Sequence, residues 1–244
     1  MKIRTFAGIS ALALAGAAQA AFVGGTLLEN EANSALSSAT VNGASRVFDL
    51  FIVFDEADDI LNSIGNASIT STDGASLIQT GVFGAVQDTD GDLNPGAWGF
   101  VPESQWDSYV AIGGPFPGAS NTTADPSFGF TATGVNGGWF DVPGEGASRQ
   151  GVAGDGVDMG NGMWGVFAGQ FVLEGSGDVR GGGGEVGDGF INSNAFSGQL
   201  DVNWIDAAGG ANIPTNGVAI RAIPAPGAAA LFGLAGITAG RRRR

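Results

Sequence analysis

The 244-residue chain contains no histidine and no cysteine, and its only lysine is Lys2. Without these side chains it cannot form a Ser-His-Asp or Cys-His nucleophile system, a thiolate or imidazole zinc site, or a disulfide. A lysine Schiff base or a phosphate-binding P-loop is excluded from the rest of the chain for the same reason. A catalytic site would have to use carboxylates, hydroxyls, the single tyrosine or a hard metal ion. These absences favour a protein that is not an enzyme.

Positive charge is also scarce in the body of the chain. The segment from Ala21 to Arg221 holds all 24 acidic residues and only four of the ten basic ones, which gives it a formal charge of −20. Such a surface repels nucleic acid and anionic lipid, so we expect binding to neither. Its natural counterions are cations, and for an exported protein calcium is the candidate ion.

The first twenty residues have the three parts of a secretory signal peptide. Lys2 and Arg4 form a basic start, the stretch from Phe6 to Ala18 is apolar, and Ala18-Gln19-Ala20 has the small-x-small pattern of a cleavage site. We therefore predict export, with cleavage between Ala20 and Ala21.

The last 23 residues, Ala222 to Arg244, also form three parts in a fixed order. Pro224-Ala225-Pro226 favours an extended backbone that a protease could hold. The next fourteen residues, Gly227 to Gly240, carry no charge, and as a helix they would span about 21 Å, less than a hydrocarbon core of about 30 Å. Four arginines, Arg241, Arg242, Arg243 and Arg244, end the chain and would stay on the cytoplasmic side of a membrane.

This ending resembles the PEP-CTERM sorting signal of exported bacterial proteins, in which a Pro-x-Pro motif, an apolar helix and an arginine cluster follow one another. Ala225 stands where the family usually has glutamate. The resemblance covers about a tenth of the chain. It implies passage through the export machinery, transient anchoring in the membrane, processing by an exosortase-type protease, and delivery to the cell surface or extracellular matrix.

Glycine, at 44 residues, separates apolar runs of five to ten residues throughout the body, which is typical of an all-β protein with many turns. The strongest predicted strand is Arg46 to Asp55, which is apolar on both faces and therefore central. Phe196 to Ile205 alternates strictly and predicts a half-exposed antiparallel strand. Further strands are expected at Ala67 to Thr72, Ser76 to Val86, Ser108 to Ile112, Phe128 to Thr133, Met163 to Glu174 and Val218 to Ile223.

No stretch of the body has an apolar stripe of helical period, so we predict no helix there. Seven or eight short strands without covering helices indicate an antiparallel β-sandwich, jelly-roll or immunoglobulin-like, over Ala21 to Arg221. The expected organisation is thus a signal peptide, one acidic glycine-rich sandwich and a C-terminal sorting signal with an apolar helix.

The best metal candidate is the stretch from Asp88 to Asn94. Asp88, Asp90, Asp92 and Asn94 offer oxygen ligands at alternate positions, as in EF-hand-like calcium loops. Leu93 stands where that pattern has glycine, and Gly99 stands where it has the bidentate glutamate. The alternative is a solvated acidic turn, because Asp, Asn and Gly are also the favoured turn residues.

Two functions follow from these patterns. The first is a non-enzymatic, exported surface or matrix protein. The alternative is a polysaccharide-binding module or a carboxylate-based glycoside hydrolase, with exopolysaccharide as the partner. Acidic pairs in Asp55 to Asp59 and Asp155 to Asp158 could supply the two carboxylates of a glycosidase, or could simply be solvated. Four tryptophans could stack on sugar rings or lie buried between sheets: Trp98, Trp106, Trp139 and Trp164.

Overall fold

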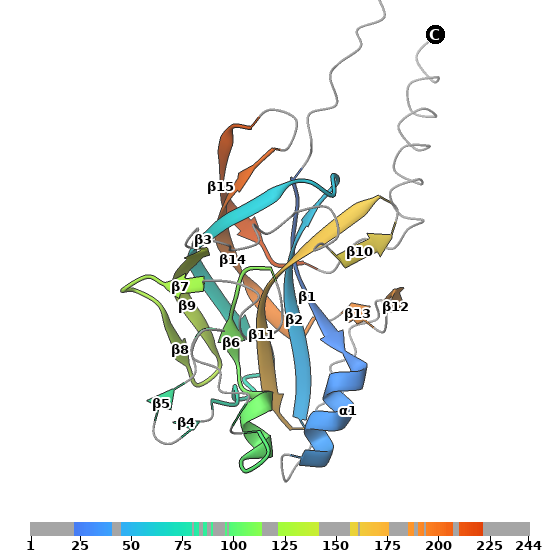
Figure 1. Cartoon of the computed structure of the whole chain (residues 1–244), viewed down its shortest axis with the longest axis vertical. Helices are drawn as coiled ribbons and strands as arrows, with labels where there is room; N and C mark the ends of the chain where they lie inside the picture. The colour runs from blue at the N-terminus through green and yellow to red at the C-terminus, as the bar shows by residue number, and fades with distance from the viewer. Residues whose placement is uncertain are drawn as a thin grey trace, which may run out of the picture.

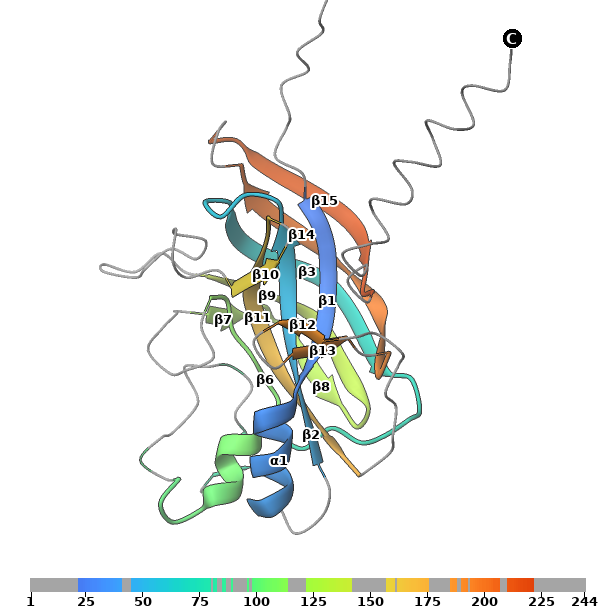
Figure 2. The same cartoon turned by 90° about the vertical axis from the view of Figure 1, so that its right-hand side faces the viewer.

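The computed structural model describes a sandwich of two antiparallel β-sheets (Figures 1 and 2). The described residues are 22–40, 45–79, 81–82, 85–86, 89, 96, 98–113, 122–141, 157–160, 162–175, 185–187, 190–192, 194–206 and 210–221. The predicted all-β antiparallel architecture is confirmed. Within these residues, no helix is long and apolar enough to cross a membrane.

The first sheet, sheet A, has the strand order β10-β11-β2-β1-β13-β12, and β6 pairs with β11 outside this path. Its strands are β1 (Phe22–Asn30), β2 (Ser45–Phe54), β6 (Tyr109–Val110), β10 (Val157–Gly160), β11 (Met163–Glu174), β12 (Glu185–Gly187) and β13 (Phe190–Asn192).

The second sheet, sheet B, has the order β15-β14-β3-β9-β7, and β8 pairs with β9. Its strands are β3 (Ile60–Ser71), β7 (Thr122–Ala124), β8 (Gly129–Thr131), β9 (Gly134–Asp141), β14 (Phe196–Ile205) and β15 (Asn212–Ala219). A separate two-stranded ribbon joins β4 (Gly81–Val82) to β5 (Ala85–Val86).

The strand β2 is central in sheet A, as its sequence predicts. It pairs with β1 on one side and β11 on the other. Phe48, Leu50, Ile52 and Phe54 point into the main core between the two sheets, where they meet Trp139 and Trp204 of sheet B. The opposite face of β2 is also buried, since Phe51 and Val53 belong to a second apolar cluster on the outer face of sheet A.

The strand β14 confirms the predicted alternation. Phe196, Leu200, Val202 and Trp204 are buried in the core, whereas Ser197 and Gln199 are exposed. β14 pairs with β3 along nearly its whole length, and β3 pairs with β9. Sheet B therefore has one face in the core and one face open to solvent, the usual arrangement of an antiparallel sheet.

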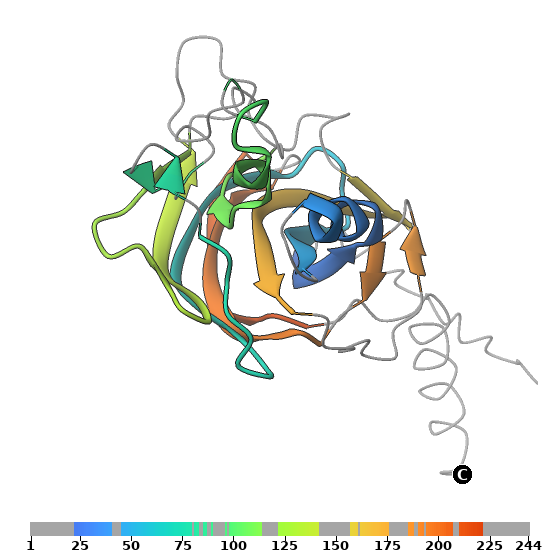
Figure 3. The same ribbon diagram turned by 90° about the horizontal axis from the view of Figure 1, so that it is seen from below.

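The absence of a helix in the body was a wrong prediction. Helix α1 (Glu31–Thr40) follows β1 directly and lies beside β2 (Figure 3). Asn30 caps its first turn, because the Asn30 Oδ1 accepts a hydrogen bond of 3.1 Å from the Asn33 N–H. No apolar stripe marks this helix because its buried positions are Ser34 and Ser37, which bond to β2 through their hydroxyls.

The predicted strand from Ser76 to Val86 is also corrected. In its first part only Leu77 makes a bridge, to Leu173, and the rest forms the short strands β4 and β5. The Leu77 N–H donates to Ala132 O at the β8–β9 turn of sheet B, while the Ile78 N–H donates to Val172 O of sheet A. The segment crosses from one sheet to the other, so it cannot pair continuously with either. The closing strand β15 also begins earlier than expected, at Asn212.

Candidate functional site

The site residues predicted from the sequence lie outside the described residues. This holds for the calcium loop at Asp88, Asp90, Asp92 and Asn94 and for the cleavage site at Ala20 and Ala21. It also holds for the sorting residues, with the expected C-terminal helix: Pro224, Ala225, Pro226, Arg241, Arg242, Arg243 and Arg244. These stay predictions.

A group of three carboxylates forms at one end of sheet B. Glu56 and Asp59 lie in the turn between β2 and β3, and Asp206 directly follows β14. The pairing of Ile60 with Ile205 brings these segments together, so that one carboxylate oxygen from each residue lies within 4.8 Å of the others. Asp59 is buried. Oxygen ligands this close could hold a hard cation such as calcium, although exposed carboxylates also approach one another without an ion.

The sequence does not predict this group, although the acidic run that contains Glu56 and Asp59 is one of its candidate sites. The solvated strand end expected there holds for the exposed Asp55, Glu56 and Asp58, but not for Asp59. Asp206 is distant in the chain, and only the pairing of β14 with β3 brings it near. No local pattern signals a contact of this kind.

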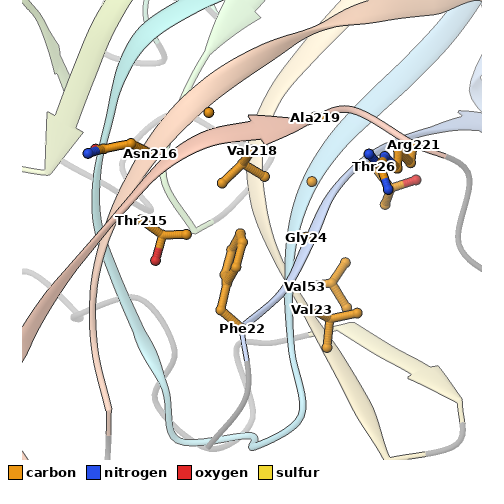
Figure 4. A pocket seen from close by; sticks show the side chains of 12 residues that line it. Phe22, Val23, Gly24, Thr26, Val53, Thr215, Asn216, Val218, Ala219 and Arg221 are labelled. Carbon is orange, nitrogen blue, oxygen red and sulfur yellow. The ribbon is translucent and has the colours of Figure 1, made fainter.

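A cleft of about 410 Å³ lies between β1 and β15, at the edge where the two sheets approach each other (Figure 4). The two strands meet through a parallel bridge of Gly25 with Ile220, and the Arg221 N–H donates to Gly25 O at 3.0 Å. The Phe22 ring extends into the space between the strands, and Figure 4 shows it pointing toward Val218. The same ring packs against Phe54 and Trp204 of the core.

The chemistry of this cleft is mostly apolar. Phe22, Val23, Val53 and Val218 line it together with hydroxyl and amide groups, and Arg221 is the only charged residue among the described ones that line it. Among the described residues that line it, none is a carboxylate. Its volume is enough to enclose a small molecule.

Asp49 is a buried acid on the outer face of sheet A, near the start of α1. Its Oδ2 accepts a hydrogen bond of 3.1 Å from Asn30 Nδ2, and its Oδ1 has no hydrogen-bond partner among the described residues. Burial raises the pKa of Asp49 to about 7, and the bond from Asn30 opposes this shift. Asp49 does not line the cleft. Its burial therefore makes the stability of the sandwich depend on pH.

Two of the four tryptophans considered for sugar stacking are buried. Trp139 is fully buried between the sheets, and Trp106 packs with Val47 and Val172 on the outer face of sheet A. For these two, the interpretation as buried aromatics is confirmed. Trp98 and Trp164 are partly exposed.

No family model, no curated protein and no solved structure matches the chain.

Proposed function

We propose that the chain is an exported, non-enzymatic protein of the cell surface or extracellular matrix. The observation that carries the proposal is the ordered C-terminal sequence of Pro-x-Pro, apolar run and four arginines, paired with the signal peptide at the other end. The body would be held at the membrane until an exosortase-type protease cuts near Pro224. The predicted signal peptide and the predicted sorting signal lie on either side of the described residues, which start at Phe22 and end at Arg221.

The body supports a binding or structural role more than a catalytic one. The described lining of the cleft is mostly apolar, with hydroxyl and amide groups that could bond to a ligand. We further propose that the sandwich is connected in a jelly-roll or immunoglobulin-like manner. Consecutive strands change sheet from β2 to β3 and from β13 to β14, as strands of β-sandwiches with Greek-key topology do.

Processing at both ends predicts a shortened mature protein. Intact mass measured on protein isolated from its native cells should correspond to a chain that begins at Ala21 and ends between about Pro224 and Gly227. Replacing Arg241 to Arg244 with serine should weaken retention of the precursor and release unprocessed chain, because the charges that hold the tail inside are gone. A surface-located protein that keeps all four arginines would refute processing of the tail.

Calcium binding is a second part of the proposal. Calcium bound only by the folded state should raise the melting temperature by mass action, and Asp90→Ala should remove most of this shift if the loop holds the ion. Asp59→Asn is the matching variant for the group of Glu56, Asp59 and Asp206. A melting temperature that is the same in calcium and in chelator would show that neither place binds calcium.

A further inference from the structure

The outer face of sheet B differs from the rest of this acidic protein in having almost no charge. In its six strands the only charged residues are Asp141 and Asp201. The strands of sheet A, by contrast, carry six charged residues: Glu29, Arg46, Asp49, Asp158, Glu174 and Glu185. The body as a whole has a formal charge of −20, so a sheet with only two charged residues differs clearly from the rest of it in composition.

Amides and hydroxyls occupy this face in rows that cross the strands. One row runs from β9 through β3 to β14 and contains Asn136, Ser68 and Gln199, which are cross-strand partners and are all exposed. A second row contains Thr123, Phe140 and Ser63 from β7, β9 and β3, and it continues to Asn203 of β14, whose Oδ1 is buried. These side chains are short apart from Gln199 and Phe140, so ordering them on a ligand costs little conformational entropy.

Phe140 is the exposed aromatic of the second row. Its neighbour Trp139 points into the core, so Phe140 points outward, and it remains 38% exposed. Thr123 and Ser63 flank it on the adjacent strands. An aromatic ring offers a flat apolar surface, and the polar groups beside it can bond to hydroxyls. That combination suits a ligand with an apolar face and many hydroxyl groups at its edge.

Of the two carboxylates in these strands, Asp201 already makes hydrogen bonds within the protein. The two oxygens of Asp201 accept hydrogen bonds of 2.7 Å each, from Asn66 Nδ2 and from the Gly217 N–H. The strands of sheet B contain no cation that could pair with an acidic sugar. The charge of the body would also repel an anionic polymer.

We propose that the outer face of sheet B binds a neutral polysaccharide, with Phe140 stacking on a sugar ring and the amide and hydroxyl rows bonding to its hydroxyls. The open side of the sheet is the face of β3, β9 and β14 turned away from sheet A (Figures 1 and 3). A sheet face suits a chain that lies across several strands better than a single small sugar. This inference concerns the body alone and does not depend on how the ends of the chain are processed.

Affinity electrophoresis and calorimetry of the protein with soluble neutral polymers test the proposal. We would use hydroxyethyl cellulose, laminarin, mannan and amylose, with alginate as an anionic comparison. The expected result is retention by at least one neutral polymer and none by alginate. Retention by alginate alone, or by no polymer, would overturn the proposal.

Two phenylalanine variants provide a matched pair for the neutral polymer that binds. Phe140→Ala should weaken binding about tenfold, the effect of losing roughly 1.4 kcal/mol of stacking. Phe100→Ala removes the same ring from an 86% exposed position outside sheet B and should leave binding unchanged. Equal effects of the two variants would refute the assignment of the face. Gln199→Ala, at an exposed position of the other row, should also weaken binding, and it serves if Phe140→Ala fails to fold.

Discussion

Replacing Gly198 with alanine should lower the free energy of unfolding by about 3 to 5 kcal/mol. Gly198 lies in β14 opposite Ile69 of β3, with a φ of +153° that side chains rarely adopt. A Cβ at this position would overlap the carbonyl oxygen of Ser68 and lie 2.8 Å from the Ile69 Cα. Because these atoms belong to the backbone of the paired strand, neither can move without disturbing the centre of sheet B.

Alanine variants of two further glycines distinguish the effect of the positive φ from the effect of the steric overlap. Gly129→Ala is the control, since Gly129 lies in β8 of the same sheet, has no positive φ, and has open space around an added Cβ. We expect it to change stability by less than about 0.5 kcal/mol. Gly134→Ala would overlap the carbonyl oxygen of Ile69 without a positive φ, so it reports the steric part alone. Urea denaturation measures all three, and equal stabilities of the Gly198 and Gly129 variants would contradict the prediction.

The sequence predicts those parts of the fold whose cause is local. β14 is recognisable because its apolar residues recur at every second position, and β2 because it is a short run that is apolar on both faces. α1 was missed because its contact with β2 depends on Ser34 and Ser37 rather than on apolar side chains. Serines have low helix propensity, so neither pattern nor composition marks the segment.

What the sequence could not provide is the set of long-range pairings that create the surfaces. The group of Glu56, Asp59 and Asp206 and the cleft between β1 and β15 both join segments from opposite ends of the body. The uncharged face of sheet B is an intermediate case. The absence of charge from Ile60 to Ser71 is visible in the sequence, but only the pairing of β3 with β9 and β14 makes it one surface.

The buried carboxyl of Asp49 links the stability of the sandwich to pH. Asp49 lies in β2 opposite Leu28 of β1 and Gln170 of β11, and the Nε2 of Gln170 is directed to the carbonyl of Asp107. Among the described residues, the carboxylate of Asp49 therefore accepts its hydrogen bond from Asn30, and that same Asn30 caps α1. An ionised Asp49 loses its hydrogen bonds to water on burial, and the single bond from Asn30 does not replace them.

Asp49→Asn should consequently stabilise the protein at pH 8 by about 2 to 4 kcal/mol and have little effect at pH 4. Burial raises the pKa of Asp49 from 3.8 to about 7, so between these values the unfolded chain releases a proton that the folded chain keeps. The free energy of unfolding of the wild type therefore falls as pH rises from about 4 to 7, and it stays low above that. Asparagine is neutral throughout and nearly isosteric, so the variant avoids this loss. Denaturation curves of both proteins from pH 4 to 8 measure the difference. A stability difference that does not grow with pH would show that Asp49 is ionised in the folded protein at neutral pH and is compensated there.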